Sequence, residues 1–414
     1  MLTRFSVTNF QCIKDTATLD MRSITLSEYK DSLINKRLLP VAAIYGPNGG
    51  GKSTLLRALF TVNTLIARHF HTIGAMSFSD LAAIGLPVTP FKFDKECLTK
   101  PTEFELFIEI DNIEYKYYIS IFNNKIVDES LFFKKITSEN SEELFSRHDK
   151  EISLGVTLKK QIKLADNIAA GTPLLAWIGM VYRVEHIEKL KKWFRSVIAV
   201  DYNNAIQDEL LLDNIFQLEL RNDEKSKRVK QKMLELLADM DLNIFSYRAE
   251  RIPINPTQFT IKISTQHKVN DKIFELNLQE ESNGTRKVFS LLPLFVVALE
   301  EGRVIIIDEM DAKIHPQLLK YIINLFTNKE NNPNGAQLIF TSHDLTTMTN
   351  EVFRRDEIWF MAMNEEENSS LYSLIDIRGE DGKIVRKDAV YNKQYIEGRY
   401  GADPYLKKIK HWEE

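Results

Sequence analysis

The chain has 414 residues, of which 44% are hydrophobic, and a formal net charge of −4. This composition is ordinary for a folded globular protein, and the length predicts two or three structural units. The charge balance excludes a global attraction to nucleic acid or anionic membrane, although it leaves a local basic patch open.

The chain shows no targeting or membrane signal. Its first ten residues, MLTRFSVTNF, lack an apolar signal core. The longest apolar stretch, 288–299, is flanked by Lys287 and Glu300 and falls well short of the ~20 residues that span a bilayer. Cys12 and Cys97 have no metal-ligand neighbours and no framework spacing, so we interpret them as reduced thiols. A cytoplasmic protein without a membrane partner is predicted.

The first part of the chain mixes strands with one helix. Residues 2–10 and the apolar run 40–45 are typical of strands, and the apolar spacing within 53–70 indicates a helix. Residues 104–135 predict antiparallel strands with turns at Asp111-Asn112 and Asn123-Asn124.

Residues 165–245 lose the strand character. Helices are predicted over 164–170, 186–200 and 225–240. In the last of these, an apolar stripe contains Met233, Leu234, Leu236 and Leu237, and it predicts either core or a surface for a partner helix.

The final third predicts alternating helices and strands. Two strands come first, at 259–263 and 272–278. Pro293 predicts a kink or an early break in the helix that follows them. Alternation of this kind is typical of parallel α/β structure. The alternating segments are 285–300, 303–307, 316–327, 337–341, 357–362 and 371–377. We therefore divide the chain into 1–164, 165–245 and 246–414.

A glycine-rich segment fits the phosphate-binding pattern G-x-x-x-x-G-K-[ST], between a predicted strand and a predicted helix. Its glycines let backbone N–H groups face phosphate oxygens, and the helix start adds partial positive charge. Lys52 is predicted to reach the β- and γ-phosphates of ATP, and Ser53 to hold Mg²⁺. The predicted nucleotide-binding residues here are Gly46, Pro47, Asn48, Gly49, Gly50, Gly51, Lys52, Ser53 and Thr54.

Two carboxylates follow the buried strand 303–307. An acid at a strand end can bind Mg²⁺, and a second acid can orient the attacking water. We assign Asp308 to the metal and Glu309 to the water, the alternative being a solvated acidic loop.

Two further segments complete the candidate site. Glu281-Ser282-Asn283-Gly284-Thr285 precedes a long helix, where it predicts either an anion-binding helix start or a plain N-cap at Ser282 or Asn283. His343 closely follows the strand 337–341 and is a candidate contact to the γ-phosphate or the attacking water, although a histidine in such a place can also be structural.

Taken in order, these segments resemble the ATP-binding-cassette ATPases. Within that class the likeness is to the chromosome-maintenance and recombination-repair branch and to bacterial overcoming-lysogenization-defect and abortive-infection ATPases. The matching stretches are FSVTNFQCIKD as the first strand, GPNGGGKST at the phosphate loop, ESNGTRK as the signature, IIIDEMDAKIHP as the acidic strand with its D-loop, and FTSHD at the switch histidine.

The resemblance implies an α/β ATPase head with an antiparallel β subdomain and a helical insertion. It implies that Ser282, Asn283 and Gly284 contact ATP held by a second copy of the chain, and that Asp311 lies near this interface. ESNGT departs from the usual LSGGQ form. The region 85–94 is the candidate for the glutamine loop, and residues 393–402 resemble the C-terminus of several bacterial defence ATPases.

Three functions fit these features. The first is an ATPase sensor or scaffold in anti-phage defence that forms a homodimer or higher even oligomer and controls a separate effector such as a nuclease or toxin. The alternative is a DNA-repair ATPase that clamps DNA when its heads close. A transporter's nucleotide-binding subunit is the third, but it would not need the insertion. Residues 344–414 lack an obvious Glu plus Asp-x-Asp nuclease set.

Overall fold

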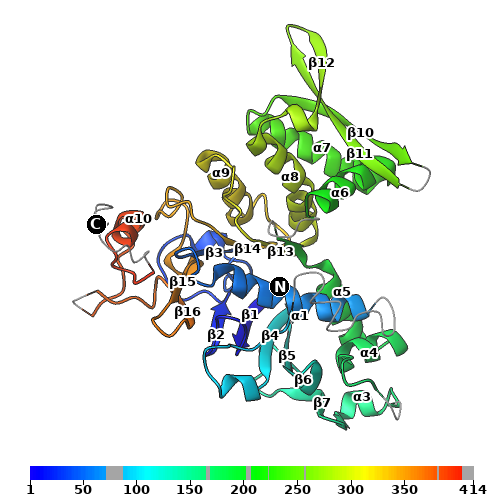
Figure 1. Cartoon of the computed structure of the whole chain (residues 1–414), viewed down its shortest axis with the longest axis vertical. Helices are drawn as coiled ribbons and strands as arrows, with labels where there is room; N and C mark the ends of the chain where they lie inside the picture. Colours follow the sequence, from blue (N-terminus) through cyan, green and yellow to red (C-terminus); the bar gives the residue numbers. More distant parts are fainter. Residues whose placement is uncertain are drawn as a thin grey trace, which may run out of the picture.

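The computed structural model describes residues 1–70, 87–164, 168–201, 207–221, 223–255, 258–379 and 382–402. These residues form three sheets with helices packed around them (Figure 1). The architecture is α/β, as predicted.

A six-stranded sheet lies at the centre and carries the candidate site. Its order is β16 (Ser369–Ser373), β15 (Ile358–Met363), β3 (Val41–Tyr45), β14 (Gln337–Thr341), β13 (Val304–Ile307) and β9 (Ile198–Val200). All neighbours are parallel except β15 and β16. Their carboxyl ends therefore share one edge, where ligands bind in α/β sheets.

Both faces of this sheet are buried, which explains why its strands are continuous apolar runs. In β3, Ala42 and Ile44 belong to one hydrophobic core, whereas Val41, Ala43 and Tyr45 belong to the other. The first core includes α1 (Lys52–His69), α4 (Leu174–Val181) and α5 (Glu185–Ser196), and the second includes α8 (Asn283–Glu301) and α9 (Pro316–Thr327).

The second sheet is antiparallel and packs on the first core. Its order is β2 (Ala17–Asp20), β1 (Leu2–Thr8), β4 (Thr102–Ile110), β5 (Ile113–Phe122), β6 (Lys125–Lys135), β7 (Glu142–His148) and β8 (Glu151–Leu154), with the short α3 (Val156–Lys159) after it. The predicted turn residues Asp111, Asn112, Asn123 and Asn124 all have positive φ, between 48° and 61°. This is the conformation that a two-residue hairpin turn requires.

The third sheet forms the green upper lobe of Figure 1 together with α6 (Gln207–Arg221), α7 (Glu224–Asp239) and α8. Its strands are β10 (Ile244–Asn255), β11 (Gln258–Val269) and β12 (Lys272–Asn277), in sequence order. Met233 and Leu237 of α7 are fully buried in the second core, and Leu234 and Leu236 pack against it. The apolar stripe of α7 is therefore core.

The structure corrects four details of the predicted elements. In 164–170, the described residues are not helical, and 165–167 lie outside the described part. The helix predicted to 200 ends at Ser196, because the apolar residues after it pair with β13 as β9. Helix α8 continues through Pro293 without a break. Strand β16 is antiparallel, so the final third is not wholly parallel.

Candidate functional site

The predicted phosphate-binding loop, residues 46–51, connects β3 to α1 and lies against the strand β15. Gly46, Gly49 and Gly51 have φ of 149°, 78° and 98°, which side chains rarely adopt. A Cβ atom at Gly46 would lie 2.2 Å from the carbonyl oxygen of Met361, and one at Gly51 would lie 2.6 Å from Oγ of Ser369. Glycine is therefore required here both by conformation and by close packing.

Lys52 begins α1 and turns back over this loop. Its Nζ donates to the carbonyl oxygens of Gly46 at 2.8 Å and Pro47 at 2.9 Å, and the residue is 6% exposed. Burial lowers the pKa of Lys52 to about 8, against the opposing effect of Asp308, Glu309 and Asp311. A buried ammonium group held by carbonyl oxygens is suited to an anionic ligand, which would favour its charged form. The loop and Lys52 thus fit the phosphates of ATP.

The two predicted acids directly follow β13 and meet the end of β14. Asp308 is 2% exposed, and its Oδ1 accepts a hydrogen bond of 2.5 Å from the hydroxyl of Thr341. The same hydroxyl accepts from the backbone N–H of Glu309 at 2.7 Å. Glu309 has φ 50°, an uncommon left-handed conformation for this residue type. Thr341 thereby fixes the positions of both acids.

His343 lies beside these acids, two residues beyond β14. Its backbone N–H donates to Oδ2 of Asp311 at 3.0 Å, while Oδ1 of Asp311 is buried without a hydrogen-bond partner among the described residues. Burial and then the charge of Lys52 lower the pKa of His343, which favours a neutral imidazole. Lys52, Asp308, Glu309, Asp311 and His343 therefore share one electrostatic environment.

The start of α8 is not hydrogen-bonded to the phosphate loop in the described structure. Ser282 is the N-cap, and its Oγ accepts from the backbone N–H of Thr285 at 3.1 Å. Ser282 and Asn283 are exposed, and among the described residues no hydrogen bond joins them to 46–54. Ser282 and Asn283 are therefore accessible to another molecule.

Thr341 and Lys287 are the residues that the sequence did not single out. Thr341 stands two residues before His343, and Lys287 ends the ESNGTRK stretch, where its Nζ donates to the carbonyl oxygen of Glu309 at 2.8 Å. Both residues lie within recognised motif stretches, and this position was the signal that could have identified them. Their bonds to Asp308 and Glu309 depend on chain segments that are distant in sequence.

The metal prediction rests on Ser53 and Asp308. Within the described ranges, no group of three or more His, Cys, Asp or Glu side chains could hold a metal ion. Mg²⁺ is usually held by one or two protein ligands together with phosphates and water. A hydroxyl at the start of α1 and a buried carboxylate are suitable donors for such a shared site.

The region 85–94 does not contribute to this group in its described part. Gly85 and Leu86 lie outside the described residues. Asp94 pairs with Lys14 at 2.8 Å, and the backbone N–H of Phe91 donates to Oδ1 of Asn9. These two contacts are with the segment after β1.

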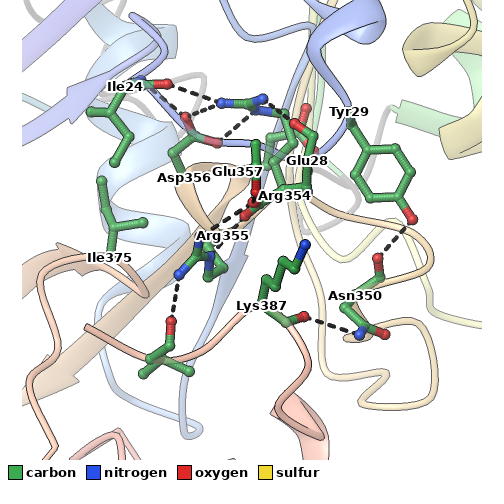
Figure 2. Close-up of polar contacts among 12 residues, drawn as sticks. Ile24, Glu28, Tyr29, Asn350, Arg354, Arg355, Asp356, Glu357, Ile375 and Lys387 are labelled. Atoms are coloured by element: carbon green, nitrogen blue, oxygen red, sulfur yellow. Dashed lines mark hydrogen bonds and ion pairs between the residues drawn. The ribbon is translucent and has the colours of Figure 1, made fainter. Parts of the chain in front are cut away.

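A second ionic cluster, whose polar contacts Figure 2 shows, directly precedes β15. Arg354 is 1% exposed and binds both carboxylate oxygens of Asp356, at 2.8 and 2.7 Å. It also donates to the carbonyl oxygens of Glu28 and Ile24, while Arg355 pairs with the Glu28 side chain at 2.7 Å. This cluster precedes β15, whose other end contacts the phosphate loop.

The tail segment 393–402 packs on strand β15 of the central sheet. The ring of Tyr395 stacks on Phe360 of β15, with centroids 5.7 Å apart, and the ring of Tyr400 lies 5.2 Å from the same residue. The tyrosine hydroxyl of Tyr372 donates to the carbonyl oxygen of Tyr400 at 2.6 Å. These two tail tyrosines are therefore part of the protein core, next to α10 (Tyr391–Ile396).

Three solved structures have similar folds. The "SMC head domain from Thermotoga maritima" is 15% identical, with a TM-score of 0.42, over 90% of this chain and 98% of that chain. The Smc head bound to the C-winged helix domain of ScpA is 13% identical, with a TM-score of 0.44, over 90% and 97%. An Smc head with an extended coiled coil, bound to the C-terminal domain of ScpA derived from Pyrococcus furiosus, is 14% identical, with a TM-score of 0.41, over 90% and 96%.

Sequence comparison identifies the family. No curated protein matches the chain. Among the described helices, none is long and apolar enough to cross a membrane. The family described as "AAA domain, putative AbiEii toxin, Type IV TA system" matches residues 41–349, which run from β3 and its phosphate loop to just past His343. Because this match covers well over half of the 414 residues, the chain belongs to that family of AAA-type ATPases.

Proposed function

We propose that this protein binds and hydrolyses ATP with Mg²⁺ at an interface between two copies arranged head to tail. One observation carries the proposal: Lys52, Asp308, Glu309 and His343 follow the carboxyl ends of the adjacent parallel strands β3, β13 and β14, whereas the exposed Ser282 makes no hydrogen bond to any of them in the described structure. A signature that is accessible but separate from its own phosphate loop is suited to a second copy.

In this proposal, each residue has one role. Lys52 and the loop N–H groups bind the phosphates, and Ser53 and Asp308 hold Mg²⁺, which neutralises phosphate charge when bound. Glu309 orients and polarises the attacking water, and His343 contacts the γ-phosphate side of the site. Ser282, Asn283 and Gly284 of the other copy close the site.

Mixing two inactive variants tests the shared site. Lys52→Ala should abolish ATP binding, whereas Ser282→Arg should block hydrolysis and leave ATP bound, as measured by calorimetric titration. In a mixed dimer, the intact loop of the Ser282→Arg chain faces the intact signature of the Lys52→Ala chain. Some hydrolysis should therefore reappear on mixing, below the wild-type rate because only one of the two sites is intact, while each variant alone stays inactive.

Absence of recovery in dimers shown to contain both variants contradicts the shared site. Lys52→Ala that still binds ATP like the wild type contradicts the nucleotide assignment itself. Arg68→Ala, in the last turn of the same helix, is the control and should bind and hydrolyse ATP normally.

We further propose that the ATP cycle controls a separate effector, such as a nuclease or toxin, in bacterial anti-phage defence. The family description and the resemblance to abortive-infection ATPases support this role. We also propose that the chain divides into 1–164, 165–245 and 246–414. In this proposal, the upper lobe contacts the effector. Because the stripe of α7 is core, the exposed Ile273 and Phe274 of β12 are the better candidates for that contact.

Native purification tests this partner. The tagged chain should recover one defined protein, and Ile273→Asp with Phe274→Asp should lose it while ATP binding persists. Lys272→Asp, on the same strand, is the matched control. Recovery of only this chain at several nucleotide states, or nucleic-acid cleavage by the purified chain alone, would falsify the separate effector.

A further inference from the structure

The signature helix α8 contacts the acidic loop of its own chain at two points. Lys287 lies one turn after the Ser282 cap, is 8% exposed, and donates from Nζ to the carbonyl oxygen of Glu309 at 2.8 Å. Burying an ammonium group is costly unless its donors are satisfied, so this contact restricts where the loop can lie.

The second contact fixes the other end of the same loop. A Cβ atom at Gly284 would lie 2.7 Å from the carbonyl oxygen of Lys313, so the helix start and the loop backbone touch directly. Glu309 and Lys313 both have left-handed conformations, with φ of 50° and 67°. Such conformations persist where surrounding contacts impose them. The start of α8 is therefore one of the supports of the loop that presents Glu309.

We infer that Lys287 is a positioning residue that couples the signature of each chain to the Glu309 of the same chain. The inference rests on the proposed function. In the head-to-tail dimer, the signature serves the site of the other copy, whereas Glu309 serves the site of its own chain. Engagement of Ser282 in one site then fixes α8, and through Lys287 it fixes the backbone of Glu309 in the other site.

This arrangement makes the two sites of a dimer interdependent. A chain whose signature is engaged has its own Glu309 held in place, so occupancy of one site favours hydrolysis at the other. Hydrolysis should consequently depend on ATP concentration with a Hill coefficient above 1. Coupling of this kind requires a physical link between the two sites, and in this proposal Lys287 is that link, since it joins α8 to the loop of Glu309.

The test compares three variants on the full-length chain. Lys287→Met keeps the length of the side chain and removes the donor, so kcat should fall about tenfold or more and the Hill coefficient should approach 1. The ATP Kd and the thermal midpoint should stay near the wild-type values. Lys287→Arg retains a cationic donor and should recover much of the rate and the cooperativity. Lys320→Met is the matched control, because Lys320 lies on α9 and pairs with Glu351, and it should retain the wild-type rate and Hill coefficient.

The outcomes separate this coupling from the proposed function. A wild-type rate and Hill coefficient in Lys287→Met overturn the coupling alone, as does an equal loss in Lys320→Met. Should Lys287→Met fail to fold, Lys287→Gln takes its place with the same expectations for the Hill coefficient, because its shorter side chain stays polar but falls short of the Glu309 carbonyl oxygen. Absence of ATP hydrolysis in the wild type overturns the proposed function and the coupling together.

Discussion

One hydroxyl group joins the two acids of the candidate site. Thr341 is fully buried, donates to Asp308 and accepts from the N–H of Glu309. A buried donor or acceptor that loses its partner costs about 1–3 kcal/mol. The geometry of both acids therefore depends on a residue of the neighbouring strand.

Replacement of Thr341 by valine should expose this dependence. Val has the same shape without the hydroxyl, so the Glu309 N–H and an Asp308 oxygen each lose the hydrogen bond to Thr341. We expect ATP hydrolysis to fall about tenfold or more, with stability lowered by about 1–3 kcal/mol. Steady-state kinetics and urea unfolding provide the two measurements. Thr341→Ser, which keeps the hydroxyl, should restore both the hydrolysis rate and the stability. An unchanged kcat in Thr341→Val would show that the hydroxyl is dispensable.

Glu309→Gln should separate ATP binding from hydrolysis. The amide keeps the size of the side chain but cannot accept a proton as the carboxylate does. Turnover should fall by about 10² or more, and an ATP-bound dimer should accumulate, visible by light scattering. His343→Ala should give a similar but milder loss. Turnover of Glu309→Gln at the wild-type rate would assign the base to another residue.

At the scale of elements, α7 and α8 form one packed unit. Val229, Met233 and Leu237 of α7 are buried, and α7 carries Arg228 and Lys232, which pair with Glu300 at the end of α8 at 2.9 and 3.2 Å. Deletion of α7 would uncover the apolar face of α8 and disturb the signature, so it cannot isolate a docking role. Point substitutions are therefore the appropriate probes of the upper lobe.

A single truncation tests this packing. Met233→Ala should lower the free energy of unfolding by about 2–5 kcal/mol, because it opens a cavity in a core that surrounds α8. Lys227→Ala, on the exposed face of the same helix, should change it by less than about 0.5 kcal/mol. Equal stability of the two variants in urea unfolding would indicate that α7 packs loosely on its neighbours.

At the scale of the whole molecule, the buried ionic cluster binds the segment after β2 and the segment around Val385 to the central sheet. Arg354 reaches the backbone at Ile24 and Glu28, and Arg355 donates to the carbonyl oxygen of Val385 at 2.6 Å. Glu357 accepts from the backbone N–H of Arg354 at 2.9 Å, but its Oε1 is buried without a hydrogen-bond partner in the described structure. Three distant parts of the chain thus meet around buried charges.

Glu357 should make stability depend on pH. Burial, reinforced by Asp356, raises its pKa from 4.5 to about 8, so the folded state favours the protonated carboxyl. The contribution of Glu357 to the free energy of unfolding is complete below about pH 4.5. It is lost as pH rises toward 8, by at most about 1.4 kcal/mol per pH unit. Glu357→Gln should remove this loss between pH 6 and 8.5 in urea unfolding. The same pH slope in the variant and the wild type would assign it to other groups.

The sequence by itself determined the α/β class, most strand and helix positions and the motifs that indicate ATP. These features are local: GPNGGGKS carries its own turn chemistry, and apolar runs such as 41–45 and 304–307 report burial on both faces. The ATPase family was also predictable, because the order of the motifs is written along the chain.

Only the tertiary structure decided which distant residues meet. Residues 198–200 form a strand because they pair with β13, although the preceding residues favour a helix. Thr341 and Lys287 acquired their contacts to Asp308 and Glu309 across 33 and 22 residues. The cluster of Arg354 spans more than 320 residues to reach Glu28 and Ile24. Such contacts carry no local signal, because their energy depends on burial and on partners that only folding brings together.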